Sequence, residues 1–401
     1  MWQTIIPLQV RVIKGNVLYF SRFIPDYRLP VLRALNERLG GRLVICSGNP
    51  PDSSSLKDLS TNAQNTVSIR RFELKNRWLG GDRLHWQSFS GALSKFSEAS
   101  VVLAEESPRS VSLPFLMRAA RKRGLATVLW GHFSSNSRKL GSEDIRDQLR
   151  MRLAKKADVL LCYTDEIADE LRARLNKDSI FVARNTLDTT VLFREHDHLL
   201  LKGKTEVRSQ IGLADKNTIL FVGRLIKEKR VDLVLAVAAQ LGSEDVSVVI
   251  IGDGPERTNL ERKARELDLS VRFTGSIADL EMSAPFIFSS DVLLNPGYLG
   301  LSVNHAFSLG VPVVAPRPQL EEARMHSPEW TYLTDGESGS LSETDSVGDL
   351  ANSCKAVLEN QTLYSENASS FARRELSLER MVDGLEDAIN HAESTRPGAN
   401  K

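Results

Sequence analysis

Residues 291–316 read DVLLNPGYLGLSVNHAFSLGVPVVAP, and this stretch decides the fold of the second half of the chain. The apolar run over 292–294 predicts a buried strand, and apolar positions three and four apart predict a helix over 302–309. Gly310 ends that helix, and the run 311–315 predicts a second buried strand. The order strand, helix, strand is typical of a βαβ unit in a parallel sheet.

The turn between this strand and this helix has the features of an anion site. The first amides of a helix have no partners within it, and the positive end of the helix favours phosphate. Gly300 lets the backbone approach a ligand closely, and Ser302 adds a hydroxyl donor. An ordinary βαβ crossover without a ligand is the alternative, so the assignment depends on motifs upstream.

Length and composition favour two domains in a reducing compartment. The 401 residues, 41% of them hydrophobic, are enough to bury two cores. Cys46, Cys162 and Cys354 stand at no metal-like spacing and suit a protein without disulfides. No apolar run reaches the length of a membrane span, and the first residues lack the pattern of a signal peptide. We therefore expect a soluble, cytoplasmic protein.

The net charge of +1 hides a strong asymmetry between the two halves. Residues 1–180 carry 29 Lys and Arg against 18 Asp and Glu, a balance of +11, which leaves −10 for residues 181–401. Basic clusters lie at 118–123 and on a helix predicted over 145–155, where Ile145, Leu149 and Leu153 form an apolar stripe. These clusters are either solvated faces of core helices or a surface that faces an anionic membrane. Nucleic acid is not expected as a partner, because no zinc spacing, RNA-binding aromatic motif or helix-turn-helix pattern occurs.

Short apolar runs alternate with helical patterns in both halves, which predicts an α/β fold with two Rossmann-like parallel-sheet domains facing a cleft. The strands predicted in the first half are Val17–Phe20, Leu43–Cys46, Val101–Ala104, Ala126–Trp130 and Val159–Cys162, and the helices are Leu29–Leu39, Arg83–Phe96, Val111–Arg123, Ile145–Lys155 and Glu166–Leu175. The strands predicted in the second half are Ile219–Val222, Val248–Ile251, Val271–Thr274, Val292–Leu294 and Val313–Ala315, and the clearer helices are Arg230–Leu241, Pro255–Leu267 and Ser302–Leu309. The polar run REHDH interrupts the alternation, so we place the domains at 1–185 and 205–377 with a linker over 186–204.

Two loops of the second half add candidates for binding a diphosphate. Arg224 follows a strand directly and Lys229 opens the next helix, so both cations lie in a loop at the carboxyl end of that strand. A solvated basic loop is the alternative. The turn Gly252-Asp253-Gly254 also joins a strand to a helix, but it is not GxGxxG, and no GxxxxGK[ST] occurs. This disfavours nicotinamide or flavin cofactors and P-loop kinases or ATPases.

Taken in order, these motifs resemble the nucleotide-binding domain of retaining GT-B glycosyltransferases of family 4, the glycosyl transferases group 1. The matching segments are FVGRLIKEKRVDLVL (221–235), IGDGPERTNL (251–260), VRFTG (271–275), SSDVLLNP (289–296) and FSLGVPVVA (307–315). RNTLD (184–188) resembles the segment between the two domains. FSRFIPDYRLPVLRALNERL (20–39) is similar to the opening of a subgroup that builds surface polysaccharides, and LWGH (129–132) is similar to a segment with a histidine near the reacting sugar.

The resemblance implies a GT-B fold in which a final helix, about 378–395, completes the first domain. It implies transfer of a hexose-type sugar from a UDP- or GDP-linked donor to a glycan or lipid-linked acceptor, with retention and without a metal cofactor. The catalytic candidates are His132, Arg224 and Lys229. The donor-binding candidates are Gly223, Gly252, Asp253, Gly254, Gly297, Tyr298, Gly300, Leu301, Ser302, Asn304 and His305. The acceptor candidates are Arg28 and Glu106.

One departure from the family pattern bears on activity. The family carries two glutamates eight positions apart around the anion turn, and here those positions hold Gly297 and His305. His305 retains the ability to hydrogen-bond a ribose, whereas Gly297 has no side chain, and Asn304, Tyr298 or Glu106 would have to take over its contact. A nucleotide-sugar epimerase of the same fold and a degenerate, non-catalytic binding subunit are the alternatives.

Overall fold

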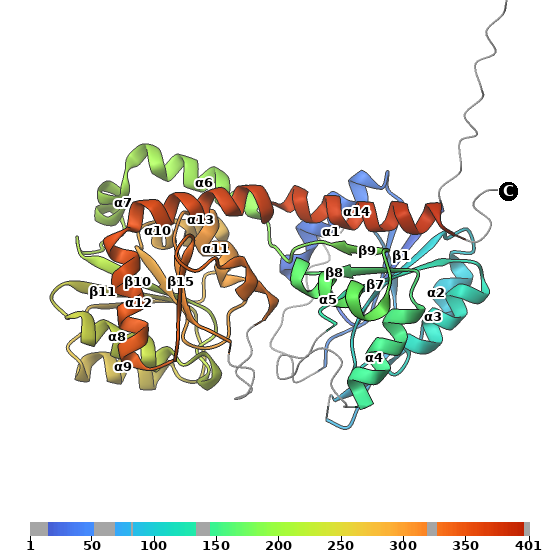
Figure 1. The fold of residues 1–401 in the computed structure, drawn as a ribbon, viewed down its shortest axis with the longest axis horizontal. Helices are drawn as coiled ribbons and strands as arrows, with labels where there is room; N and C mark the ends of the chain where they lie inside the picture. The colour runs from blue at the N-terminus through green and yellow to red at the C-terminus, as the bar shows by residue number, and fades with distance from the viewer. Residues whose placement is uncertain (1–14, 52–68, 82, 134–144, 319–326, 397–401) are drawn as a thin grey trace, which may run out of the picture.

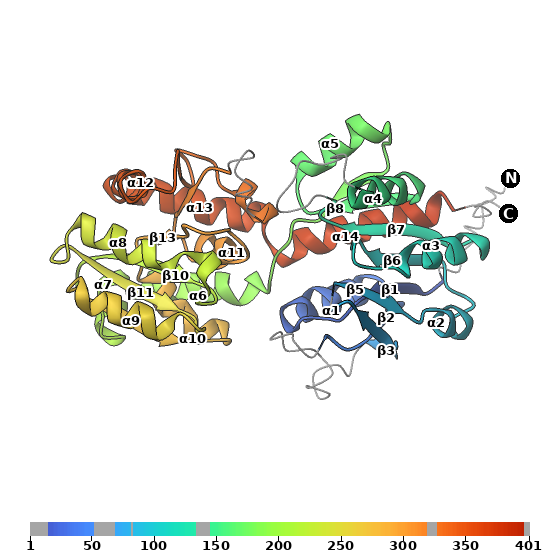
Figure 2. The same cartoon turned by 90° about the horizontal axis from the view of Figure 1, so that it is seen from below.

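The computed structural model describes residues 15–51, 69–81, 83–133, 145–318 and 327–396, and it places them in two α/β domains that lie side by side (Figure 1). Each domain is built on a parallel sheet with helices on both faces (Figure 2). The α/β class and the two Rossmann-like sheets predicted from the continuous apolar runs are therefore confirmed.

Within the described residues, the first sheet has seven parallel strands in the order β3-β2-β1-β6-β7-β8-β9. The strands are β1 (Val17–Ser21), β2 (Leu43–Ser47), β3 (Arg70–Glu73), β6 (Val101–Glu105), β7 (Ala126–Gly131), β8 (Val159–Cys162) and β9 (Ile180–Val182). The helices are η1 (Asp26–Arg28), α1 (Leu29–Arg38), α2 (Ser90–Lys95), α3 (Leu113–Lys122), α4 (Ile145–Lys156) and α5 (Asp165–Leu175). Alternate residues of each central strand enter the cores on opposite faces of the sheet, as Leu103 and Val102 of β6 do.

In the described part of the second domain, six parallel strands follow the order β12-β11-β10-β13-β14-β15. The strands are β10 (Asn217–Val222), β11 (Val246–Ile251), β12 (Val271–Gly275), β13 (Val292–Leu294), β14 (Val313–Pro316) and β15 (Gly339–Ser342). The helices are α6 (Thr189–Lys202), α7 (Lys204–Gln210), η4 (Lys227–Lys229), α8 (Val231–Leu241), α9 (Arg257–Glu266), α10 (Leu280–Phe288), α11 (Ser302–Ser308), η6 (Pro328–Tyr332), α12 (Val347–Glu359) and α13 (Gln361–Glu375). Helix α6 occupies most of the range predicted as a linker, and its apolar side, with Leu192 and Leu199, joins the core of the second domain.

The last helix, α14 (Leu378–Ser394), follows the second domain in sequence but packs on the first (Figure 1). Its buried residues Met381, Leu385 and Ile389 belong to the same core as the first sheet and helix α1. The Ser377 side chain caps the helix by accepting from Arg380 N at 3.1 Å. The chain therefore passes between the domains twice, after β9 and after α13.

The predicted helix over 83–96 is wrong in its first half. Residues Leu84–Gln87 form strand β5, which pairs antiparallel with β4 (Asn76–Leu79), and only Ser90–Lys95 is helical. His85 and Gln87 point inward. The backbone of β5 hydrogen-bonds the loop before α3, with His85 N donating to Arg109 O at 2.9 Å. The alternation in LHWQ places polar residues inside, which is the reverse of the usual pattern for a half-buried strand.

The predicted apolar stripe on helix α4 is wrong at Leu149, whereas Leu153 packs against the core, and the side chain of Ile145 lies outside the described residues. Leu149 is 51% exposed, whereas Arg150 and Asp147 of the same helix are 5% and 4% exposed. Helix α4 therefore turns a polar pair toward the interior. The reason lies in the pocket of the first domain, where Arg150 meets a carboxylate from β6.

Candidate functional site

Both sheets place their functional loops where the strand order reverses. In the first sheet β1 lies between β2 and β6, and in the second β10 lies between β11 and β13. In open α/β sheets such reversals leave a crevice outside the carboxyl ends of the strands, where ligands bind. Ser21 and Glu105 end two of these strands in the first domain, and Gly223 and Asn295 follow two in the second.

In the second domain, the two predicted cations lie in the loop that follows β10. Arg224 is exposed at the strand end, and Lys229 ends the short helix η4. The Lys229 ammonium donates to the carbonyl of Tyr298 at 2.7 Å and lies 3.7 Å from the centre of its ring. The structure thus brings the loop after β10 against the loop after β13, and Lys229 and Tyr298 join them through a hydrogen bond and a cation–π contact.

Burial lowers the pKa of Lys229 from 10.5 to about 8, and the nearby Glu329 carboxyl opposes that shift. A partly buried ammonium favours an anion that replaces its lost hydration. A diphosphate seated between Lys229 and Arg224 would supply that charge.

Gly297 is where this loop contact is closest. A Cβ at Gly297 would lie 2.4 Å from Glu228 O and 2.7 Å from Lys229 Cα, so no larger residue fits without moving the Lys229 loop. Gly297 therefore holds Lys229 in place through backbone packing, whereas Gly300 has open space around it. The close packing of the two loops therefore requires glycine at position 297.

The glycine turn after β11 packs against the loop that carries Arg224. A Cβ at Gly252 would lie 1.8 Å from Gly223 O, and one at Gly254 would lie 2.4 Å from Leu225 O. The Asp253 carboxylate accepts from Gly254 N at 2.7 Å and from Arg257 at 3.1 Å, which closes the turn. Close backbone packing therefore explains why glycine stands at both positions, and this packing fixes the backbone beside Arg224.

The residues predicted around helix α11 divide into two groups. Leu301 and Ser302 begin the helix next to the open space at Gly300, and the Ser302 hydroxyl lies 3.4 Å from the Asn295 amide. Asn304 is fully buried, and its amide donates to Asn185 O at 3.1 Å and to Thr186 Oγ1 at 3.0 Å. Asn304 thus anchors the segment between the domains. Burial lowers the pKa of His305 to about 4, so its ring is neutral at neutral pH.

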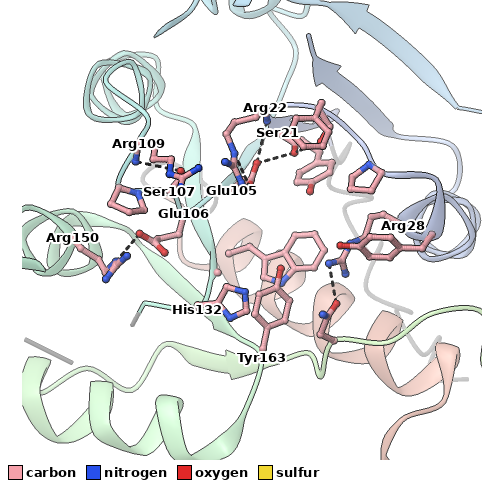
Figure 3. Close-up of a pocket in the computed structure, with 18 residues that line it drawn as sticks. Ser21, Arg22, Arg28, Glu105, Glu106, Ser107, Arg109, His132, Arg150 and Tyr163 are labelled. Atoms are coloured by element: carbon pink, nitrogen blue, oxygen red, sulfur yellow. Dashed lines mark hydrogen bonds and ion pairs between the residues drawn. The ribbon is translucent and has the colours of Figure 1, made fainter. Parts of the chain in front are cut away.

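The first domain contains a pocket of about 490 Å³ at the carboxyl ends of β1, β6, β7 and β8 (Figure 3). This volume is in the range of small-molecule sites. The residues that line it are Tyr19, Ser21, Arg22, Phe23, Pro25, Tyr27, Arg28, Glu105, Glu106, Ser107, Pro108, Arg109, Trp130, Gly131, His132, Arg150, Tyr163 and Asn185. The structure therefore brings together three residues predicted from the sequence, Arg28, Glu106 and His132.

Both glutamates of the pocket are engaged by arginines. Glu105 accepts from Arg22 at 2.6 Å and from the Ser21 hydroxyl at 2.9 Å, and these contacts hold its pKa below the usual value in spite of burial. Glu106 accepts from Arg150 Nε at 2.9 Å, and Arg150 also pairs with Asp147 at 2.8 Å. Burial raises the pKa of Glu106 although Arg150 opposes the shift.

His132 directly follows β7 and lies beside Tyr163, with 4.6 Å between ring centres. Burial and the charge of Arg28 lower the pKa of His132 to about 4. Its Nδ1 is buried without a hydrogen-bond partner in the described part of the chain. A neutral imidazole with a free nitrogen is suited to a hydrogen bond with a sugar hydroxyl.

A chain of side chains joins this pocket to the second domain. Arg28 donates to Asn185 Oδ1 at 2.9 Å, and Asn185 Nδ2 donates to Glu329 Oε1 at 2.6 Å. Glu329 is 3% exposed, burial raises its pKa, and its Oε2 has no partner among the described residues. The charges of Arg28 and Lys229 both act on Glu329, so the first-domain pocket and the Lys229 loop face each other across one buried carboxyl.

Several of these groups are not identified by sequence reasoning. Arg22, Glu105 and Tyr163 each follow or end a predicted strand, so their position at a sheet edge was an available signal. Arg150 and Glu329 offered none, because one lies in a helix with a misleading stripe and the other in η6 after the last predicted strand. Across the described residues, no group of three or more His, Cys, Asp or Glu has the arrangement of a metal site.

Comparisons with known proteins agree with this architecture. Residues 216–360 match the family model of the glycosyl transferases group 1. The alpha-D-kanosaminyltransferase of Streptomyces kanamyceticus is 27% identical over 58% of this chain and 60% of its own length. The lipopolysaccharide core biosynthesis glycosyltransferase LpsE of Rhizobium meliloti is 27% identical over 55% of this chain and 59% of its own length. The chain thus matches at most about three fifths of these relatives.

The likeness in structure extends over nearly the whole chain. The crystal structure of Anabaena HepE in complex with UDP superposes with a TM-score of 0.68 over 94% of this chain and all of that one, at 15% identity. At this identity the likeness establishes the fold alone. The chain therefore has a GT-B fold, and residues 216–360 of its second domain match the glycosyl transferases group 1 family model.

Proposed function

We propose that this protein is a glycosyltransferase that moves a hexose-type sugar from a UDP- or GDP-linked donor to a glycan or lipid-linked acceptor in cell-surface polysaccharide synthesis, with retention. The observation that carries the proposal is the partly buried ammonium of Lys229 beside the exposed Arg224, opposite the first-domain pocket. The family match over 216–360 and the name of the relative LpsE support the activity and the acceptor class.

The geometry accounts for how charge is handled during transfer. Negative charge develops on the diphosphate as it leaves the sugar, and fixed cations in a site shielded from water stabilise it most. Lys229 and Arg224 meet this need from one loop, so no metal is required for the proposal. Helix α11 has only seven residues, so the two side chains contribute most of the positive charge. His132, across the cleft, contacts the reacting sugar.

A thermal-shift panel with UDP, GDP and their sugars tests the proposal. A ligand at 100 times its dissociation constant stabilises the folded protein by about 2.7 kcal/mol. Nucleotide release that depends on an added acceptor supports transfer. Nucleotide release without an acceptor supports an epimerase, and no stabilisation by any nucleotide supports a non-catalytic subunit.

We also propose that the first domain attaches to anionic membrane surfaces. None of the described helices is long and apolar enough to cross a membrane. The tip of the β4–β5 hairpin exposes Leu79 and Leu84, and helix α3 exposes Phe115, whose ring lies 5.6 Å from that of Trp86 in the hairpin. The hairpin and helix α3 also carry exposed basic residues at Arg77, Arg83, Arg118, Arg121 and Lys122. Arg150, in contrast, is buried in ion pairs and does not contribute.

Co-sedimentation with vesicles tests the attachment. Each basic residue near an anionic leaflet contributes about 1 kcal/mol, and salt screens it. We expect binding to anionic and not to zwitterionic vesicles, and its loss when Leu79, Leu84 and Phe115 are changed to Ser. Leu201→Ser on α6, where the leucine is 88% exposed in the second domain, is the matched control. Equal binding of the triple variant and the control would refute the surface.

A further inference from the structure

The first-domain pocket contains more positive charge than its carboxylates neutralise. Four arginines line it, and the glutamates already pair with two of them, Arg22 and Arg150. Among the described residues, no carboxylate oxygen lies within ion-pair distance of the other two, Arg28 and Arg109. Arg109 is exposed at the rim, whereas Arg28 is 6% exposed.

The surroundings of Arg28 are aromatic. Its guanidinium lies 4.8 Å from the ring centre of Trp130, 5.5 Å from that of Tyr27 and 5.9 Å from that of Tyr163. The Arg28 side chain also hydrogen-bonds the Tyr27 side chain, donates to the amide oxygen of Asn185 and approaches the sulfur of Met381 at 3.7 Å. A buried charge is costly without an opposite charge, and aromatic faces compensate for only part of the lost hydration.

On the side that faces the cavity, the Arg28 guanidinium can donate hydrogen bonds to a ligand. A guanidinium has five donors in a planar fork. Asn185 and the Tyr27 side chain accept from it, and Met381 offers only a weak acceptor, so donors remain for a ligand. His132 lies in the same wall, and Figure 3 shows Arg28, His132 and Tyr163 around one side of the cavity. An oxyanion that accepts from Arg28 leaves the attached polyol against His132 and the aromatic rings.

We propose that this pocket binds the acceptor through an oxyanion of that acceptor, a phosphate ester or a carboxylate, held by Arg28 and attracted by Arg109 at the rim. The inference rests on the proposed function only in identifying the bound molecule as the acceptor. The diphosphate of the donor is a different anion, because its cations, Arg224 and Lys229, belong to the loop after β10 in the other domain.

Isothermal titration of the full chain tests the site with defined probes. Glycerol 3-phosphate and glucuronate are the anionic probes, and glycerol and glucose are their neutral counterparts. We expect the anions to bind at least about tenfold more tightly, equivalent to about 1.4 kcal/mol, and the binding to weaken with added salt. Preference for the first probe indicates a phosphate ester, and preference for the second indicates a uronic acid.

Variants distinguish anion binding at this site from a general effect of the protein's charge on binding. Arg28→Gln should weaken anion binding at least about tenfold, because a charge-assisted fork is lost. Arg109→Gln, which changes an exposed residue outside the core, should weaken it by up to about fivefold and keeps the test valid if Arg28→Gln fails to fold. Arg174→Gln, on the surface of α5 in an exposed pair with Glu170, should have no effect.

The outcomes distinguish this inference from the proposed function. Anion binding that equals binding of the neutral probes, or that neither Arg28→Gln nor Arg109→Gln weakens, would overturn the inference. UDP and GDP affinity, measured in Arg109→Gln, should stay unchanged, because Arg109 lies at the rim and outside the chain of hydrogen bonds that joins Arg28 to Glu329. If nucleotides bind and the anionic probes do not, the inference fails while the glycosyltransferase proposal stands. If the anions bind and no nucleotide does, the inference about the anion site stands while the glycosyltransferase proposal fails.

Discussion

Lys229 makes nucleotide binding depend on pH in a range where most lysines stay charged. Its pKa of about 8 in the free protein means that the ammonium is about 90% protonated at pH 7 and about 10% protonated at pH 9. A diphosphate binds the charged form, so affinity for UDP or GDP should fall about tenfold between these values. This fall corresponds to about 1.4 kcal/mol.

Two substitutions isolate the contribution of Lys229. Lys229→Arg keeps a charge that does not titrate in this range, so its affinity should lose the fall between pH 7 and pH 9. Lys229→Met should bind weakly at every pH and show no such fall. The assay is isothermal titration at constant ionic strength. A wild-type affinity that stays flat to pH 9, or a fall that persists in Lys229→Arg, would refute the assignment.

The stability of the free protein should change in the opposite direction. The folded-state pKa lies below the unfolded value of 10.5, so between about pH 8 and pH 10.5 the unfolded chain binds more protons. Below pH 8 the full cost of the buried charge is present, at most about 3 kcal/mol. Lys229→Met should therefore melt at a higher temperature than the wild type at pH 7, and the difference should shrink toward pH 10. A constant difference would contradict the burial argument.

Four further outcomes follow from the site. Arg224→Ala should weaken UDP or GDP binding about tenfold or more by titration calorimetry, with Arg262→Ala on the surface of α9 as the unaffected control. His132→Ala should lower turnover more than nucleotide affinity, and because its pKa is about 4, the wild-type rate should show no titration of this histidine between pH 6 and 8. Glu329→Gln removes a charge that raises the pKa of Lys229, so the fall in nucleotide affinity should move to lower pH. Turnover should survive EDTA, since the cations of the β10 loop take the role of a metal.

The order of strands and helices was predictable because it rests on local patterns. Continuous apolar runs such as Val101–Ala104 and Val292–Leu294 specify strands buried on both faces, and no distant residue is needed to interpret them. The positions of Arg224, Lys229 and His132 at the carboxyl ends of strands were predictable for the same reason, and their roles in a site stay a prediction. Each follows a predicted strand closely, and the carboxyl ends of parallel strands meet at one edge of the sheet.

Helix α4 shows where local patterns fail. Its leucines suggested an apolar stripe, yet Arg150 faces inward because Glu106, 44 residues earlier in the chain, directly follows β6 at the same crevice. The energy of that ion pair belongs to the contact between two distant elements, and no periodicity within either segment encodes it. The predicted helix over 83–96 fails for a similar reason, because the backbone of the buried His85 hydrogen-bonds the loop before α3.

The sequence by itself determined two parallel sheets and the loop that carries Arg224 and Lys229, because strand boundaries and their flanking residues are local features. Only the tertiary structure decided what these loops face. It brought Arg28, Asn185 and Glu329 into one buried chain of hydrogen bonds between the domains, and it packed Gly297 against the backbone of Lys229. Burial of a charge depends on neighbours from every part of the chain, so the buried charge of Arg28 and the lowered pKa of Lys229 arise only in the folded protein.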